Sequence, residues 1–164
     1  MRKIIFLDID GVLNSNFWND AHQKEISDGT LIDEEKVKLL GELVRSTGAS
    51  IILHSGWRFW FDSNLEPTRK EAANLRTLLA GEGISIAGVT PDFTTEEIRK
   101  NRKFSLVKAR EIFAWLSEHQ EAAKWIVIDD LDLHDDEIAK HQIKTDPQVG
   151  LTIENILRAK EILL

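Results

Sequence analysis

The sequence predicts an α/β protein in which helices pack on both faces of a mostly parallel, five-stranded sheet, giving three layers. Two observations lead to this prediction. Short apolar runs alternate along the chain with longer amphipathic stretches, as in repeated strand–helix–strand units. The apolar runs are also continuous, which is typical of parallel strands covered on both faces. No linker or internal repeat interrupts this order, so residues 1–164 are predicted to form a single domain.

The five predicted strands are short, and each is bounded by a turn or a helix. The first run leads into a turn at Gly11, and the second follows a helix that stops at Gly48. The third follows the Gly-rich end of a helix, the fourth reads WIVID and ends in paired acids, and the fifth is the briefest. The predicted ranges are 4–9, 51–53, 84–90, 125–129 and 141–146.

Four longer stretches carry the apolar spacing and the end signals of helices. Asp33 is a suitable N-cap for the first, which has an acidic first turn and stops at Gly48. Thr152 is a suitable N-cap for the last, with Glu154 in its first turn. The predicted ranges are 33–46, 68–83, a helix from near 104–108 to about 119, and 152–163, with a short helix near 132–139.

The least regular segments, 14–32 and 56–67, follow the first and second predicted strands. Both should therefore lie over the same edge of the sheet. Ligands of open α/β sheets bind beyond the carboxyl ends of the strands, so this edge is where a functional site is expected.

Composition bounds the function before any motif is considered. The net charge is −7, so the overall field should not attract nucleic acid. Residues 98–110 nevertheless contain six Lys or Arg, which either face a phosphate or form a solvated surface. The chain has no cysteine, which excludes disulfides, thiolate catalysis and Cys-based zinc sites and fits a cytoplasmic protein. No apolar run approaches the ~20 residues that span a bilayer, so no membrane partner is expected.

Acidic and hydroxyl side chains gather at the predicted carboxyl ends of three strands. Asp8 and Asp10 end the first strand, and Asp129 and Asp130 end the fourth. The second ends in His54, Ser55 and Gly56. Four carboxylates around one crevice would repel strongly without a cation, and hard oxygen ligands in this number favour Mg²⁺. The sequence therefore predicts a Mg²⁺ site with a hydroxyl donor beside it and a lysine nearby to balance charge.

These segments also carry a resemblance to a known family. FLDIDGVLN at 6–14, IILHSGWR at 51–58, a lysine near the start of the helix before the fourth strand, and WIVIDDLD at 125–132 resemble the four motifs of the haloacid dehalogenase (HAD) superfamily, in order and over nearly the whole chain. With REIFAWL at 110–116 and TDPQVGLT at 145–152, they also resemble a small branch associated with RNA-repair proteins. The resemblance implies a three-layer, Rossmann-like HAD fold, here with a minimal cap or none.

By this resemblance, Asp8 is the nucleophile that becomes an aspartyl phosphate. Asp10 would protonate the leaving group, activate water and bind Mg²⁺ through its backbone carbonyl. Ser55, through its hydroxyl and backbone amide, and Gly56 would bind the transferring phosphoryl group. His54 should point away from the site and pack or form a hydrogen bond.

The sequence leaves two assignments open. Lys103 and Lys108 both lie near the start of the helix before the fourth strand. The branch pattern favours Lys108 as the catalytic lysine, and the other lysine would belong to the basic patch and contact substrate. The resemblance implies that Asp130 ligates the metal directly and that Asp129 orients the lysine or a metal-bound water, although either order fits adjacent residues at a strand end.

The short segments around the predicted site suggest an open pocket that could admit a bulky phosphate. Arg58 is the expected substrate contact outside the motifs, while Trp57 or Trp60 could stack on a base or pack the loop onto the sheet. The leading interpretation is a Mg²⁺-dependent phosphomonoesterase, with a nucleic-acid end as one candidate substrate. The alternatives are a small-metabolite or nucleotide phosphatase and a non-catalytic phosphate-binding module. The oligomeric state is left open.

Overall fold

A computed structural model describes residues 2–164, so only residue 1 of the predicted domain lies outside the described part. It contains a five-stranded, all-parallel sheet with the order β3-β2-β1-β4-β5. The predicted fold class is therefore confirmed. The strands are β1 (Arg2–Leu7), β2 (Ser50–Leu53), β3 (Ile86–Val89), β4 (Ala122–Asp129) and β5 (Gln142–Lys144).

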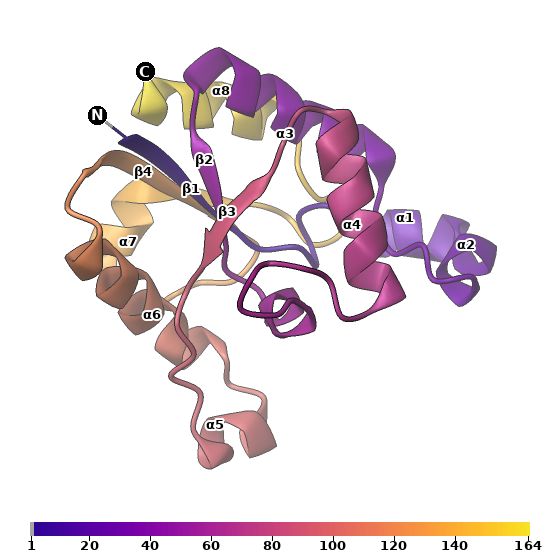
Figure 1. Ribbon diagram of the computed structural model, residues 1–164, viewed down its shortest axis with the longest axis horizontal. Helices are drawn as coiled ribbons and strands as arrows, with labels where there is room; N and C mark the ends of the chain where they lie inside the picture. Colours follow the sequence, from indigo (N-terminus) through magenta and orange to yellow (C-terminus); the bar gives the residue numbers. More distant parts are fainter. Residues whose placement is uncertain (1) are drawn as a thin grey trace.

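Helices form a layer on each side of the sheet (Figure 1). One layer contains α3 (Glu34–Thr47), α4 (Lys70–Gly81) and α8 (Ile153–Leu163), and the other contains α6 (Ser105–Glu118) and α7 (Asp136–His141). Side chains that alternate along β1 divide between two cores: Ile5 and Leu7 pack toward the first layer, and Ile4 and Phe6 toward the second. The continuous apolar run of β1 is thereby explained, since both of its faces are buried.

The predicted helix ends are confirmed at the positions that carried clear signals. Asp33 accepts a hydrogen bond from the amide of Glu35 at the start of α3, and Gly48 ends that helix with a φ of 71°. Thr152 caps α8 in a capping box with Asn155. Glu154 lies in the first turn, where its charge suits the helix dipole.

Three short helices were not predicted. The segment 14–32 contains α1 (Asn16–Ala21) and α2 (Gln23–Ser27), and the segment after β3 contains α5 (Glu96–Asn101). Each is five or six residues long and has no buried residue, so none has an apolar face that periodicity could reveal. Residues 91–104, here called the arm, carry α5 away from the body of the protein (Figure 1). Across residues 2–164, no helix combines the length and apolar character needed to cross a membrane.

Candidate active site

Asp8 follows β1, the central strand, at the carboxyl edge of the sheet. Leu7 pairs with Leu53 of β2 on one side and with Ile128 of β4 on the other. The amide of Asp8 donates to the carbonyl of Ile128 at 3.0 Å, and the amide of His54 donates to the carbonyl of Leu7 at 2.8 Å. This register brings the residues after three strands to one place, where the chain order reverses on either side of β1.

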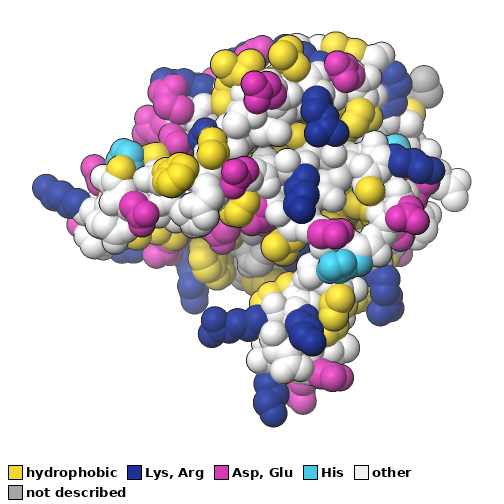
Figure 2. Space-filling view, turned by 180° about the vertical axis from the view of Figure 1, so that it is seen from behind, with side chains coloured by type: hydrophobic (Ala, Val, Ile, Leu, Met, Phe, Trp, Pro, Cys, Tyr) yellow, Lys and Arg dark blue, Asp and Glu magenta, His cyan; other side chains and the backbone are white. Residues whose placement is uncertain are grey.

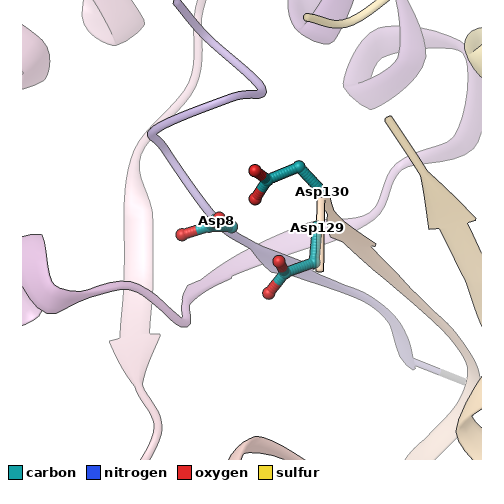
Figure 3. A group of neighbouring side chains, drawn as sticks. All are labelled: Asp8, Asp129 and Asp130. Carbon is teal, nitrogen blue, oxygen red and sulfur yellow. The ribbon is translucent and has the colours of Figure 1, made fainter. Parts of the chain in front are cut away.

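Asp8, Asp129 and Asp130 form a cluster of three carboxylates, each with an oxygen within 4.8 Å of the others (Figure 3). Burial raises the pKa of Asp8 well above its usual value, and the charges of Asp129 and Asp130 raise it further, against the opposing charge of Lys108. Burial likewise raises the pKa of Asp130. An ion bound by these oxygens would relieve both desolvation and repulsion, so the donor set fits a hard divalent cation.

Lys108, from the first half of α6, reaches into this cluster. Its Nζ lies 3.7 Å from Oδ1 of Asp8 and forms a short ion pair with Oδ2 of Asp129. Burial alone would lower the pKa of Lys108, but the charges of Asp8 and Asp129 outweigh it and hold that pKa above its ordinary value. The other carboxylate oxygen of Asp129 accepts from the amide of Leu131 at 2.9 Å. Asp129 is therefore committed to holding the lysine, which leaves Asp130 the better placed of the two for a metal.

Gly11 makes room for the Asp130 side chain. Its φ of +82° lies in the left-handed region, and a Cβ built on it would be 2.6 Å from Oδ2 of Asp130. The carbonyl of Gly11 accepts from the Thr145 hydroxyl at 2.8 Å, which ties this turn to the residue after β5. Glycine is thus required at position 11 both because the backbone adopts a positive φ and because the Asp130 carboxylate leaves no room for a Cβ.

The carboxylate of Asp10 lies outside the group of three, although the sequence predicted four acids around one cation. Its Oδ1 accepts from the Asn14 side-chain amide at 2.9 Å, and its Oδ2 accepts from Trp57 Nε1 at 3.2 Å. Asn14 in turn accepts from the amide of Gly11 at 3.0 Å. The Gly11 turn rotates Asp10 away from Asp8, so that the two acids serve different positions at the pocket.

Ser55 and Gly56 form the neighbouring wall, after β2. Ser55 is buried and caps the short 3₁₀ helix η1 (Gly56–Trp60), accepting a hydrogen bond from the amide of Trp57 at 3.2 Å. Both residues line a cavity of about 440 Å³ together with Asp8, Asp10, Lys108 and Asp130. The residues predicted from four distant motifs thus share one pocket.

A protein-family model described as the HAD domain in Swiss Army Knife RNA repair proteins matches residues 4–156. The chain belongs to this family. In the other two comparisons, no curated protein and no solved structure matches the chain. Family membership supports a HAD-type phosphatase in general terms.

A buried ionic network supports the wall of the HAD domain formed by η1. The Glu111 carboxylate, one turn after Lys108 on α6, accepts from Arg58 at 3.0 Å and from His54 Nε2 at 3.2 Å. It also accepts from the amide of Phe93 in the arm at 2.9 Å. Because a carboxylate can only accept here, His54 carries its proton on Nε2. Burial lowers the pKa of His54 to about 4, so the ring is neutral.

Arg58 and Lys103, which the sequence suggested as substrate contacts, lie in different surroundings. Arg58 lines the pocket but is only 8% exposed, and its guanidinium donates to the carbonyls of Ser55 and Pro91 as well as to Glu111. Its hydrogen bonds therefore hold the wall together. Lys103 is exposed on the arm, outside the residues that line the cavity, whereas Lys108 lies inside it.

The aromatic residues of η1 divide by face. Trp57 is buried and its ring lies 4.8 Å from that of Trp60, so Trp57 packs the loop and orients Asp10 instead of stacking on a base. Phe59, which the sequence analysis did not single out, lines the pocket and is 52% exposed. A 3₁₀ helix has three residues per turn, which places residues 57 and 60 on one face and residue 59 on another.

Glu111 was also missed by sequence reasoning. The available signal was an acid on the apolar face of the helix, three residues after the candidate lysine. A second cavity of about 540 Å³ lies between β3 and α6, lined by residues including Trp115 and His119. It contains none of the three clustered acids, so chemistry and not size marks the active site.

Proposed function

We propose that this HAD domain is a Mg²⁺-dependent phosphomonoesterase that works through an aspartyl phosphate on Asp8. The observation that carries the proposal is the position of Asp8 in the pocket, where it lies beside both Lys108 and the acids at the end of β4. A buried carboxylate with a fixed cation and further oxygen ligands beside it is suited to attack phosphorus.

Asp8 and Asp130 are the side chains that would hold the metal, with the backbone carbonyl of Asp10 as the third protein ligand implied by the family resemblance. Mg²⁺ would supply Lewis-acid polarisation of the phosphoryl oxygens and offset the charge of the acids. Lys108 supplies a fixed positive charge beside Asp8, held there by Asp129. This charge is present before substrate binds, so little reorganisation is needed during the reaction.

In the first step, a carboxylate oxygen of Asp8 forms a bond to phosphorus and the bond from phosphorus to the leaving oxygen breaks. Protonated Asp10 gives its proton to the leaving oxygen, which departs as an alcohol. The hydroxyl and amide of Ser55 and the amide of Gly56 hold the phosphoryl oxygens. Trp57 and Asn14 keep the Asp10 carboxylate oriented for this proton transfer.

In the second step, the Asp10 carboxylate takes a proton from water as the water oxygen bonds to phosphorus. The bond between phosphorus and the Asp8 oxygen breaks, which restores both carboxyl groups and releases inorganic phosphate. One water is consumed and one alcohol is produced in the full cycle, so no other reactant is required.

A nucleic-acid end is the substrate class we favour over a small metabolite. The pocket is open beside an arm in which four of the five residues 99–103 are Lys or Arg. The family is also described from RNA repair proteins. A polymeric phosphate can enter such a site, and the cations offer contacts to the phosphates beyond the end.

The test is release of phosphate from an aryl phosphate and from oligonucleotides phosphorylated at either end, with Mg²⁺ and with a chelator. Asp8→Asn should lower release at least roughly 10³-fold, whereas Asp20→Asn, an exposed acid on α1, should not change it. Acid quenching followed by mass spectrometry should detect one phosphoryl group on the peptide that contains Asp8. Turnover that persists in Asp8→Asn would exclude Asp8 as the nucleophile.

A further inference from the structure

Two exposed phenylalanines from different segments of the chain line the active-site pocket. Phe59 comes from η1, and Phe104 lies at the junction of the arm and α6; they are 52% and 41% exposed. Neither side chain belongs to the two hydrophobic core clusters, so neither is needed for core packing. Aromatic rings held open beside a reaction site are suited to contact a flat ligand group.

The buried Glu111 contacts the two segments that carry these rings. The guanidinium of Arg58 lies 4.6 Å from the ring centre of Phe59, and Glu111 fixes that guanidinium with a hydrogen bond of 3.0 Å. The same carboxylate accepts from the amide of Phe93 and so anchors the base of the arm. One acid therefore fixes both walls of the pocket before ligand binds, which lowers the entropy that a ligand must overcome.

Each ring lies about four residues along the chain from a group proposed to hold the phosphate. Phe104 precedes Lys108 by about one helical turn, a rise of ~5–6 Å. Phe59 follows Ser55 by four residues across η1. A phosphate held at Asp8 by Lys108 and Ser55 would therefore place the next part of its alcohol between these side chains. A sugar fills that interval, and a base attached to it would reach the rings.

The arm adds positive charge next to Phe104. Arg99, Lys100, Arg102 and Lys103 lie in its second half, and Arg99 lines the pocket. The acids of α5, Glu96 and Glu97, lie in the first turn of that helix, before these cations. Seen from behind, the lobe at the lower edge of the molecule carries Lys and Arg side chains (Figure 2). A chain of phosphates leaving the pocket would meet these cations.

We infer that the pocket binds the unpaired terminal nucleotide of a single-stranded nucleic acid, with Phe59 and Phe104 stacking on its base and the arm binding the phosphates that follow. This inference rests on the proposed function for the position of the terminal phosphate. A base within a duplex is already stacked and paired, and removing it costs free energy. The cavity of about 440 Å³ has room for one nucleotide.

The test measures equilibrium binding to the Asp8→Asn protein in Mg²⁺ buffer, so that the probes stay intact. The probes are short RNA strands with a phosphate at the 5′ or the 3′ end and a fluorophore at the other. Each is made with and without the base of the phosphorylated nucleotide. In at least one polarity, loss of the base should weaken binding by roughly 5- to 150-fold, the range found for stacking on an aromatic side chain.

Substitutions then identify the residues responsible. Phe59→Leu and Phe104→Leu should each weaken binding of the strand with its terminal base and leave the abasic strand unchanged. Phe17→Leu is the matched control, because Phe17 on α1 is 64% exposed and lies outside the pocket lining. Arg102→Gln and Lys103→Gln should each reduce the slope of log Kd against log salt by about 0.7 if each cation contacts one phosphate.

The inference would be overturned if strands with and without the terminal base bound equally, whether the phosphate is at the 5′ or the 3′ end. It would also be overturned if the Phe variants lost the same affinity for both kinds of strand. A blunt duplex that binds as tightly as the single strand would do the same. A wild-type protein that releases phosphate but ignores the base would leave the proposed phosphatase intact and remove only the stacking site. The expected binding pattern without any phosphate release would instead contradict the phosphatase and keep the nucleotide site.

Discussion

The indole nitrogen of Trp57 donates a hydrogen bond to the carboxylate of Asp10 across 3.2 Å, from a ring that is almost completely buried. The packing of η1 on the sheet therefore sets the orientation of the proposed acid. Asn14 holds the other carboxylate oxygen from the loop after β1. Each carboxylate oxygen of Asp10 thus has its own hydrogen-bond donor, as expected for a group that must transfer a proton in a fixed direction.

Trp57→Phe should slow the release of poor leaving groups more than that of good ones. An alkyl alcohol needs its proton in the transition state, whereas a nitrophenolate departs without one. We expect kcat for alkyl phosphates to fall by roughly 10-fold or more and kcat for nitrophenyl phosphate to change little. Trp60→Phe is the control, because Trp60 packs on Trp57 without a hydrogen bond to Asp10. Equal effects on both substrates would contradict this role.

Gly11→Ala should weaken Mg²⁺ binding because the new Cβ would press on the Asp130 carboxylate. Its φ of +82° also adds backbone strain of about 1 kcal/mol. Gly83→Ala separates the two effects, since Gly83 has a φ of +74° and open space around it. Both variants should lose a similar amount of unfolding free energy, because each places an alanine at a positive φ. Only Gly11→Ala should raise the Mg²⁺ concentration needed for half-maximal phosphate release, and equal Mg²⁺ requirements would argue against Asp130 as a ligand.

Glu111→Ala should reduce the free energy of unfolding by about 3 kcal/mol, because it leaves the buried Arg58 guanidinium without its carboxylate. Glu118→Ala, at the exposed end of the same helix, should cost less than about 1 kcal/mol. Chemical denaturation of both variants provides the measurement. A loss in Glu111→Ala no larger than that in Glu118→Ala would show that the network contributes little to stability.

His54 should make stability fall as the pH falls below its unfolded pKa of about 6.5. Its pKa in the folded protein is about 4, so between these values only the unfolded chain takes up the proton. This difference lowers the free energy of unfolding by about 3 kcal/mol over that range and by little more below it. At pH 7 and above, the contribution is fully present.

Urea unfolding at several pH values between about 5 and 7 checks the His54 prediction. His54→Gln retains a donor for Glu111 but does not titrate. Its unfolding should therefore take up one proton fewer over this pH range, so its unfolding free energy should change less with pH. His134→Gln, at an exposed histidine, should follow the wild-type profile. Parallel profiles for the wild-type and His54→Gln proteins would contradict a neutral, buried His54.

The parts of the molecule that the sequence predicted are those that depend on local patterns. The apolar run before Asp8 and the paired acids at 129–130 identified β1 and β4, and parallel register then brought their ends together. The resemblance to the branch pattern favoured Lys108, which lies beside Asp8, over Lys103, which lies on the arm. Strand ends and helix caps are short-range features, so one sequence was enough to locate them.

The parts that were missed depend on how one element lies against another. Glu111 is important because α6 packs so that its carboxylate meets Arg58 of η1 and the amide of Phe93, and no spacing in the sequence shows that meeting. Phe59 was missed because the sequence does not show which aromatic side chain of residues 56–61 faces the pocket. The 3₁₀ geometry of η1 decides which ring is buried and which is open.

The arm differs from the sheet in how it is attached, and this has an evolutionary consequence. Main-chain hydrogen bonds of Leu7 and Asp8 fix the end of β1 to the chain on both sides. The arm instead carries α5, which buries no residue, and is anchored near its start by Arg58 and Glu111. Insertions or exchanges between Thr94 and Lys103 would leave the reacting groups in place. New substrate preferences could therefore be acquired by grafting this segment alone, without rebuilding the chemistry beneath it.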